Sequence, residues 1–338
     1  MKRFICLFLS VLMLLCCFSA CGTQTPEETV APTAAAEPPQ EAGVLKILTL
    51  GNSGTVDSCH LLNLVAATEG FEGELLVGSL YYSGCKLSQH VSFIKSGERV
   101  YNLYLSSSTT PDQPPKILQE VSMLDALNFE YWDIVILQTT AGEATDDTTF
   151  EDGRIQFIQN CVRENVKNPN FRFAFHHTGV SASDPELIAT YPYTPNGYAN
   201  TYAKYNNDRM AYYQAALSGF ERFIYTDETF DFIIPSGPAL MNAWTSYLTE
   251  KDIHRDYTHT TDFGRVIQAY TYYCRVAGVE QLEEIKLDAV PQVFLKSAAD
   301  KTQDRPLTEM EKAIILESVN NALANPLEVT QSQYTVAP

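Results

Sequence analysis

The sequence predicts an α/β fold, a three-layer αβα sandwich built around a parallel, five-stranded sheet. Short apolar runs of strand length alternate along the chain with longer runs of helical periodicity. Strands that alternate with helices form parallel sheets that helices cover on both faces. The clearest strand is residues 132–137, Trp-Asp-Ile-Val-Ile-Leu, which is apolar almost throughout, as expected of a strand buried on both sides.

Five strands and six helices are expected in order along the chain. The strands are the apolar runs at residues 44–50, 74–80, 132–137, 171–175 and 231–234. The helices have apolar residues at helical spacing, at residues 56–67, 117–127, 150–166, 202–220, 261–277 and 308–324. Polar, proline-containing segments at residues 106–115 and 185–200 predict loops. Five such strands favour a flavodoxin-like sheet.

The N-terminus has the pattern of a secretory signal peptide. Lys2 and Arg3 supply positive charge, and residues 4–18 form an apolar run that is short for a membrane span. We therefore expect residues 1–20 to be removed and the protein to be exported from the cytoplasm.

Cleavage is expected just before Cys21. Residues 18–21, Phe-Ser-Ala-Cys, resemble a bacterial lipobox with Phe in place of the usual Leu. That resemblance implies that Cys21 is lipidated and anchors the protein to the outside of the bacterial cell membrane; the alternative is cleavage without lipid. Residues 21–43 contain almost no large apolar side chain, so we expect a disordered acidic tether.

Composition limits the class of protein and its partners. The chain has 338 residues with 45% hydrophobic and 19% charged residues, enough for a sizeable core. We expect a globular domain at residues 44–278 and a C-terminal extension at residues 279–338 with one helix packed on that domain. The formal net charge of −18 argues against nucleic acid as a partner. Four cysteines remain after the lipobox, with no zinc-binding spacing and no pairing that can be assigned: Cys59, Cys85, Cys161 and Cys274.

Two motifs at opposite ends of the predicted sheet suggest nucleophilic catalysis. Gly51-Asn52-Ser53 follows the first strand, where a glycine turn can present a serine at the carboxyl edge of the sheet. Asp256 lies three residues before His259, just ahead of the last core helix. An aspartate so placed can accept the imidazole Nδ1–H and leave Nε2 free to take a proton from a serine.

These motifs resemble the blocks of the SGNH hydrolase superfamily, the GDSL-type esterases and lipases. Gly51-Asn52-Ser53 resembles the first block, Gly84 the glycine of the second, and Asp256-Tyr257-Thr258-His259 the last. The third block usually supplies Asn, and Gln138 stands there in this chain. The resemblance is to a poorly characterised bacterial branch with Gly-Asn-Ser in the first block.

The resemblance implies a role for each matched residue. Ser53 would be the nucleophile, His259 the general base and Asp256 its orienter. The oxyanion hole would be formed by the backbone N–H groups of Ser53 and Gly84 with the side chain of Gln138. Two further candidates for substrate binding are Asn52 and His177. His177 follows a strand together with His176, and a structural histidine is the alternative for either.

We therefore expect an extracellular serine esterase that works through an acyl-enzyme, with no metal and no cofactor. An O-acetyl ester of a carbohydrate is the preferred substrate, and a lipid or lysophospholipid ester is the second. The rival is a non-catalytic glycan-binding lipoprotein on the same fold. Gln138, and Gly54 where the family usually has Leu, leave that rival open.

Overall fold

The computed structural model describes residues 43–179, 181–190, 204–206, 208–291 and 304–337. The signal peptide at residues 1–20, Cys21 and all but Gly43 of the expected tether lie outside these residues. The described residues belong to one compact unit, Gln40–Pro338. None of the helices among them combines the length and the apolar character that crossing a bilayer requires.

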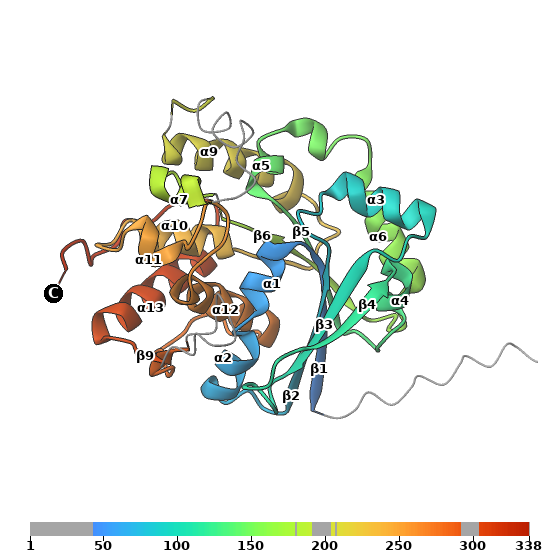
Figure 1. The fold of residues 1–338 in the computed structure, drawn as a ribbon, viewed down its shortest axis with the longest axis horizontal. Helices are drawn as coiled ribbons and strands as arrows, with labels where there is room; N and C mark the ends of the chain where they lie inside the picture. Colours follow the sequence, from blue (N-terminus) through green and yellow to red (C-terminus); the bar gives the residue numbers. More distant parts are fainter. Residues whose placement is uncertain (1–42, 180, 191–203, 207, 292–303, 338) are drawn as a thin grey trace, which may run out of the picture. The chain divides into compact units, whose positions relative to one another are not determined.

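A central seven-stranded sheet organises the fold (Figure 1). Its order is β4-β3-β2-β1-β5-β6-β7. The last five of these run parallel, while β3 and β4 are antiparallel to their neighbours. The strands are β1 Val44–Gly51, β2 Glu74–Tyr81, β3 Tyr101–Ser107, β4 Lys116–Val121, β5 Ile134–Thr139, β6 Arg172–His177 and β7 Phe232–Ile234. The α/β class is confirmed, with seven strands in the sheet instead of the five expected.

The two additional strands form a hairpin at one edge of the sheet. Residues 117–127 were expected to be a single helix, which is wrong for their first half. Residues up to Val121 pair with β3, and only Met123–Leu127 are helical. The pairing shifts register between Tyr101 and Leu103, and Glu120 has a positive φ of 55°. Such irregularities and mostly exposed side chains are usual in an edge strand.

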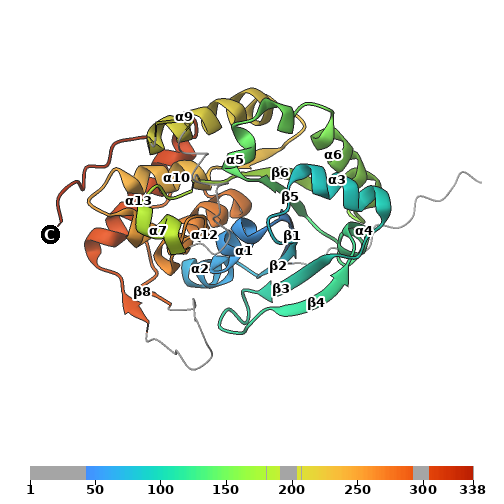
Figure 2. The same ribbon diagram turned by 45° about the horizontal axis from the view of Figure 1, so that its top comes forward.

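Helices cover both faces of the sheet (Figures 1 and 2). On one face, α12 contacts α1, α2, α10, α11 and α13. On the other face, α3, α4 and α6 contact one another. The first group is α1 Ser53–Cys59, α2 Leu62–Glu69, α10 Ser236–Trp244, α11 Glu250–Ile253, α12 Asp262–Ala277 and α13 Glu309–Ala324; the second is α3 Leu87–Ser96, α4 Met123–Leu127 and α6 Arg154–Asn165.

The remaining elements are short or lie beside the carboxyl ends of the strands. Helices α5 and α9 contact each other there. These elements are α5 Ala141–Ala144, the 3-10 turn η1 Asp147–Thr149, α7 Pro185–Thr190, α9 Arg209–Phe220, the π-helical turn η2 Glu221–Tyr225, and the paired strands β8 Ala289–Val290 and β9 Arg305–Pro306. Residues 185–190 are therefore helical where a loop was expected.

The last core helix, α12, is buried on nearly every side because it lies between the sheet and a layer of other helices. The expected start of this helix is correct: Thr261 is the N-cap, and its Oγ1 accepts the Gly264 N–H at 3.1 Å. The cap fixes the point at which the preceding loop, with Asp256 and His259, joins the helix.

The C-terminal helix α13 begins with a capping box. Thr308 Oγ1 accepts the Glu311 N–H at 3.2 Å, and the Glu311 carboxylate accepts the Thr308 N–H at 2.9 Å. The helix packs on α10 and α12. The buried Asn242 of α10 joins it there, donating to Ser318 O at 3.2 Å and accepting from Thr330 N–H at 2.8 Å.

Candidate active site

A tight turn at residues 51–54 follows β1 and opens α1. Asn52 is the N-cap, and its Oδ1 accepts the Gly54 N–H at 2.9 Å, which leaves the half-buried Ser53 as the first residue of the helix. A Cβ at Gly51 would lie 2.1 Å from Thr55 Oγ1 and 2.5 Å from Gln138 Oε1, so a larger residue here would displace both side chains from the turn.

Asn52 also joins this turn to the next one along the sheet edge. Its Nδ2 donates to Cys85 O at 3.0 Å. Cys85 closes a turn with Tyr82, through a backbone hydrogen bond of 3.1 Å, and Gly84 within that turn has a φ of +60°. Only glycine adopts that conformation without strain. The Asn52 side chain therefore caps its own turn through Oδ1 and ties that turn to the next one through Nδ2.

The side chain of Gln138, at the end of β5, lies against the first turn. Its Oε1 accepts the Asn52 N–H at 3.3 Å and the Thr55 hydroxyl at 2.9 Å, and its Nε2 donates to Thr139 O at 3.1 Å. These partners fix which end of the amide is oxygen and which is nitrogen. A primary amide nitrogen carries two hydrogens, so Nε2 has a second donor beyond the one that Thr139 O accepts.

The predicted Asp256–His259 pair is formed. His259 Nδ1 lies 2.9 Å from Asp256 Oδ2 and 3.0 Å from Oδ1, and the backbone N–H groups of Thr258 and His259 donate to Oδ1 at 2.9 and 2.8 Å. Burial raises the pKa of Asp256, but the hydrogen bond and charge of His259 outweigh it and lower the pKa to about 2. An ionised carboxylate accepts only, so Nδ1 carries the proton and Nε2 is left as the basic nitrogen.

The loop that carries this pair, residues 254–260, is closed and anchored. His254 and Thr260 form an antiparallel bridge, and the Arg255 N–H donates to His259 O at 3.0 Å. Both flanks of the loop also bind the carboxylate of Asp57: Arg255 Nη1 donates to Oδ2 at 3.0 Å and the Thr260 N–H at 3.2 Å. We call residues 254–260 the His259 loop.

Asp57 has a buried carboxylate to which several groups donate, and the sequence did not identify it as part of the site. Arg265 Nη2 donates to its Oδ1 at 2.7 Å and also binds Asp262 through Nη1 at 2.7 Å. Burial raises the pKa of Asp57, but the guanidinium groups of Arg265 and Arg255 outweigh it, and the pKa is lowered. The only sequence signal was an acidic residue one helical turn after Ser53.

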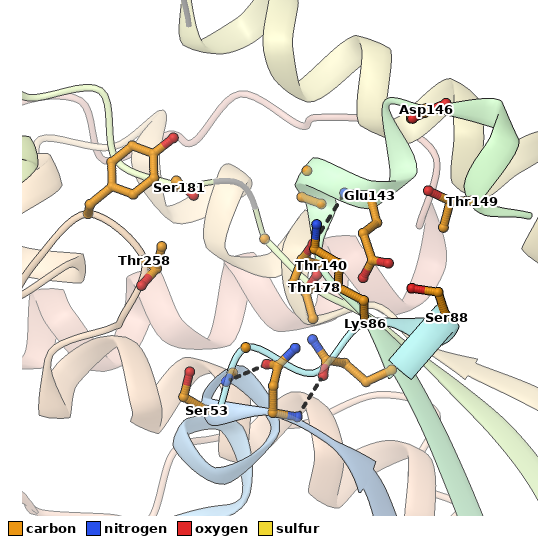
Figure 3. A pocket seen from close by; sticks show the side chains of 18 of the residues that line it. Ser53, Lys86, Ser88, Thr140, Glu143, Asp146, Thr149, Thr178, Ser181 and Thr258 are labelled. Atoms are coloured by element: carbon orange, nitrogen blue, oxygen red, sulfur yellow. Dashed lines mark hydrogen bonds between the residues drawn. The ribbon is translucent and has the colours of Figure 1, made fainter. Parts of the chain in front are cut away.

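Several of the predicted residues line one cavity of about 490 Å³ (Figure 3). Ser53, Gly84 and Gln138 line it, together with Asn52. Thr258 of the His259 loop lines it too. His259 itself is not a lining residue, and its side chain is 17% exposed.

Glu143, on α5, also lines this cavity. Thr139 Oγ1 donates to Glu143 Oε2 at 2.5 Å. Burial raises the pKa of Glu143, even though the Thr139 hydroxyl, the backbone N–H groups of Thr140 and Leu87 and the charge of Lys86 act to lower it.

The structure places His177 elsewhere. Its side chain is 0% exposed among the rings of Tyr213, Phe220 and Tyr225, and its Nδ1 lies 3.0 Å from the Tyr225 hydroxyl. Burial lowers the pKa of His177 to about 3. It is not among the described residues that line the cavity, so it packs in an aromatic cluster instead of facing that space.

The cysteines and other side chains able to bind a metal ion are dispersed through the described structure. The four remaining cysteines are buried and unpaired: Cys59, Cys85, Cys161 and Cys274. Over the part of the chain that the structure describes, there is no group of three or more His, Cys, Asp or Glu side chains that could hold a metal ion.

Comparison with known proteins identifies similar chains. The model of the family described as "Domain of unknown function (DUF4886)" matches residues 46–292. The crystal structure of a DUF4886 family protein from Bacteroides uniformis ATCC 8492 superimposes with a TM-score of 0.66 at 20% identity, covering 85% of this chain and 98% of that one. A Slackia heliotrinireducens protein described as a "putative SGNH hydrolase" has a TM-score of 0.39 at 15% identity, covering 68% and 97%. No curated protein sequence matches the chain.

Proposed function

The chain belongs to the DUF4886 family, and we propose that it is a serine ester hydrolase of the SGNH type with Ser53, His259 and Asp256 as its catalytic triad. The observation that carries the proposal is the anchoring of the His259 loop. A preformed Asp–His pair lies on a loop whose two flanks bind Asp57, and Asp57 lies on the helix that Ser53 begins. A nucleophile, a base and an orienting carboxylate are the groups that acyl transfer needs.

In the first step Ser53 Oγ attacks the carbonyl carbon of the ester while His259 Nε2 takes the hydroxyl proton. Asp256 holds the imidazole in the tautomer whose Nε2 carries no proton, and it stabilises the imidazolium that forms. The alcohol then leaves with that proton, and an acyl-Ser53 ester remains. Water, activated by the same imidazole, hydrolyses this ester and restores the serine.

The tetrahedral intermediates need donors for the negative oxygen. We propose the backbone N–H groups of Ser53 and Gly84 and the second hydrogen of Gln138 Nε2. Support comes from the connections between them: Asn52 ties the Gly84 turn to the nucleophile turn, and Gln138 Oε1 accepts the Asn52 N–H. Donors that are held in place before the reaction stabilise the transition state most effectively.

The proposed setting is the outer face of a bacterial membrane, with Cys21 as the lipid anchor and an O-acetyl ester of a carbohydrate as the substrate. The polar lining of the cavity supports a hydroxyl-rich substrate over a lipid, since it includes Lys86, Glu143 and several hydroxyl groups. The same polar lining favours the rival of a protein that binds a glycan without turning it over.

Two measurements test the activity. The wild-type protein should hydrolyse 4-nitrophenyl acetate, and Ser53→Ala should abolish this turnover, whereas Ser92→Ala, which removes an exposed hydroxyl on α3, should not. A fluorophosphonate probe should label Ser53 in the wild type and fail to label His259→Ala. Turnover that survives in Ser53→Ala would overturn the assignment. Labelling and turnover that are both absent, with a sugar still bound, would favour the glycan-binding protein.

A further inference from the structure

Across the cavity from Ser53 lies a wall that the triad chemistry does not use. It is formed by Lys86 and Ser88 at the start of α3, Glu143 on α5, and Thr149. Figure 3 shows Ser53 and Thr258 toward one side of the cavity and these four residues, which we call the far wall, toward the other. These residues come from α3 and its N-cap, from α5 and from η1, so regular secondary structure holds the far wall in place.

Glu143 is held in a defined position on this wall. It is the third residue after the cap of α5, where Thr140 Oγ1 accepts its N–H at 3.2 Å. The Thr139 hydroxyl then holds one carboxyl oxygen, Oε2, at 2.5 Å. The backbone N–H groups of Thr140 and Leu87 also act on this carboxyl group, and Glu143 lines the cavity together with Lys86, so a ligand there meets a carboxyl group of fixed position.

The far wall can both donate hydrogen bonds to hydroxyl groups and accept hydrogen bonds from them. Lys86 donates, an ionised Glu143 accepts, and the hydroxyls of Ser88 and Thr149 do either. Sugar hydroxyls are at once donors and acceptors, so a sugar ring can pair with each of these groups. A hydrocarbon chain in the same place would take the carboxylate and the ammonium group out of water without a partner, which is unfavourable.

From this geometry we infer that the far wall is a subsite for a neutral, hydroxyl-rich part of the substrate, such as a sugar ring, and that Glu143 is the residue that recognises its hydroxyls. The inference rests on the proposed hydrolase function and adds to it a specificity-determining residue. Glu143 takes no part in the bond-making steps at Ser53.

The test compares two acetate esters of similar size. In both methyl 6-O-acetylglucoside and cyclohexylmethyl acetate, the acetyl group is on a methylene group that is attached to a six-membered ring. Only the ring of the glucoside has hydroxyls. The quantity measured is the ratio of their kcat/KM values. We expect the wild type to favour the glucoside by about tenfold or more, since its ring hydroxyls can pair with the polar groups of the far wall and a hydrocarbon ring would cover those groups without a partner.

Three variants locate the source of that preference. Glu143→Leu should lower the ratio about tenfold, mainly through KM for the glucoside, and Glu143→Gln, which keeps an acceptor of the same shape, should lower it less. Glu72→Gln is the matched control, because it removes the same charge from an exposed residue just before the amino end of β2. An unchanged ratio in Glu143→Leu would overturn the inference.

A second measurement separates this inference from the proposed activity. Binding of methyl glucoside, which has no ester, can be followed by NMR in Ser53→Ala and in Ser53→Ala combined with Glu143→Leu. Binding that weakens about tenfold in the double variant supports the subsite even if no ester is turned over. Equal binding in the two, or none in either, rejects it. If Glu143→Leu does not fold, the comparison is made with Glu143→Gln.

Discussion

The guanidinium group of Arg255 donates two hydrogen bonds to the carboxylate of Asp57, at 3.0 and 3.2 Å, across 198 positions of sequence. Asp57 lies one helical turn after Ser53, and Arg255 directly precedes Asp256. Two hydrogen bonds between one guanidinium and one carboxylate fix the orientation of the two groups as well as the distance between them. The helix that begins with Ser53 and the loop that carries His259 are thereby held to the same buried group.

Asp57→Asn tests this link. The substitution keeps the shape but removes the negative charge, so Arg255 and Arg265 lose their shared counter-ion in a buried site. We expect the free energy of unfolding to fall by about 3 kcal/mol, as in other buried ion pairs that lose one member. At a temperature where the variant is folded, kcat should fall about tenfold with little change in KM, because the base is displaced while the cavity remains.

Asp262→Asn is the matched control, since it removes another carboxylate that Arg265 binds and leaves Asp57 in place. It should destabilise the protein and affect kcat less than Asp57→Asn does. If the two variants lose kcat equally, Asp57 has no special part in positioning the His259 loop.

The members of the triad should differ in their effect on turnover. His259→Ala removes the base and should lower kcat about a millionfold, close to the loss in Ser53→Ala. Asp256→Asn leaves a base but disturbs its tautomer, so a loss of about ten thousandfold is expected. Steady-state kinetics with 4-nitrophenyl acetate measures both. A larger loss in Asp256→Asn than in His259→Ala would contradict the assigned roles.

Gln138→Glu isolates the proposed oxyanion donor. A carboxylate can still accept from Asn52 and Thr55 as Gln138 Oε1 does, but it offers no hydrogen and repels a negative oxygen. We expect kcat to fall about a hundredfold or more with little change in KM. Thr55→Val removes only a donor to Oε1 and should leave kcat within about threefold of the wild type. A normal kcat in a well-folded Gln138→Glu protein would mean that other groups form the oxyanion hole.

Glu143 should make stability depend on pH. Because burial raises its pKa in the folded state, the folded protein binds more protons than the unfolded chain just above the ordinary carboxyl range, and stability falls as pH rises through that window. Charged and titratable neighbours in or beside the cavity are Lys86, Cys85, Asp146 and Arg154. Glu143→Gln removes the penalty, so its melting temperature relative to wild type should be higher at pH 7 than at pH 4. A difference that does not change with pH would contradict this account.

Lipid attachment at Cys21 stays a prediction, since this residue lies outside those that the structure describes. Expression of Cys21→Ala in a bacterial host should release the protein into the medium or the extracytoplasmic fraction. Cys17→Ala, within the same apolar run, is the control and should remain attached to the membrane. A Cys21→Ala protein that stays membrane-bound to the same extent would show that the anchor is something else.

Apolar runs in the sequence were enough to predict the strands of the parallel part of the sheet. All five expected strands are present, because strands buried on both faces are continuous apolar runs, as in residues 132–137. The hairpin of β3 and β4 was missed for the opposite reason. Residues 116–121 are mostly exposed and include Lys116 and Glu120, and a charged edge strand has neither an apolar run nor a clear alternation.

Local motifs predicted the Asp256–His259 pair and the turns at Ser53 and Gly84, since each is formed by neighbours in sequence. The groups that hold these pieces together could not be predicted in that way. Asp57 binds Arg255 and Arg265 across about 200 positions of sequence. The sequence around each of these three residues gives no indication of its partners.

The wide separation of these partners has a consequence for biosynthesis. Ser53 and Asp57 belong to the first part of the domain to be made, whereas Arg265, which donates to Asp57, follows 208 residues later. Until Arg255 and Arg265 are synthesised, Asp57 on α1 has neither of these two counter-ions, and burying it would be costly. On the proposed mechanism, the nascent chain therefore completes its active site only near the end of synthesis, and a product that stops short of α12 contains the whole serine turn but lacks Arg265, one of the groups that bind Asp57.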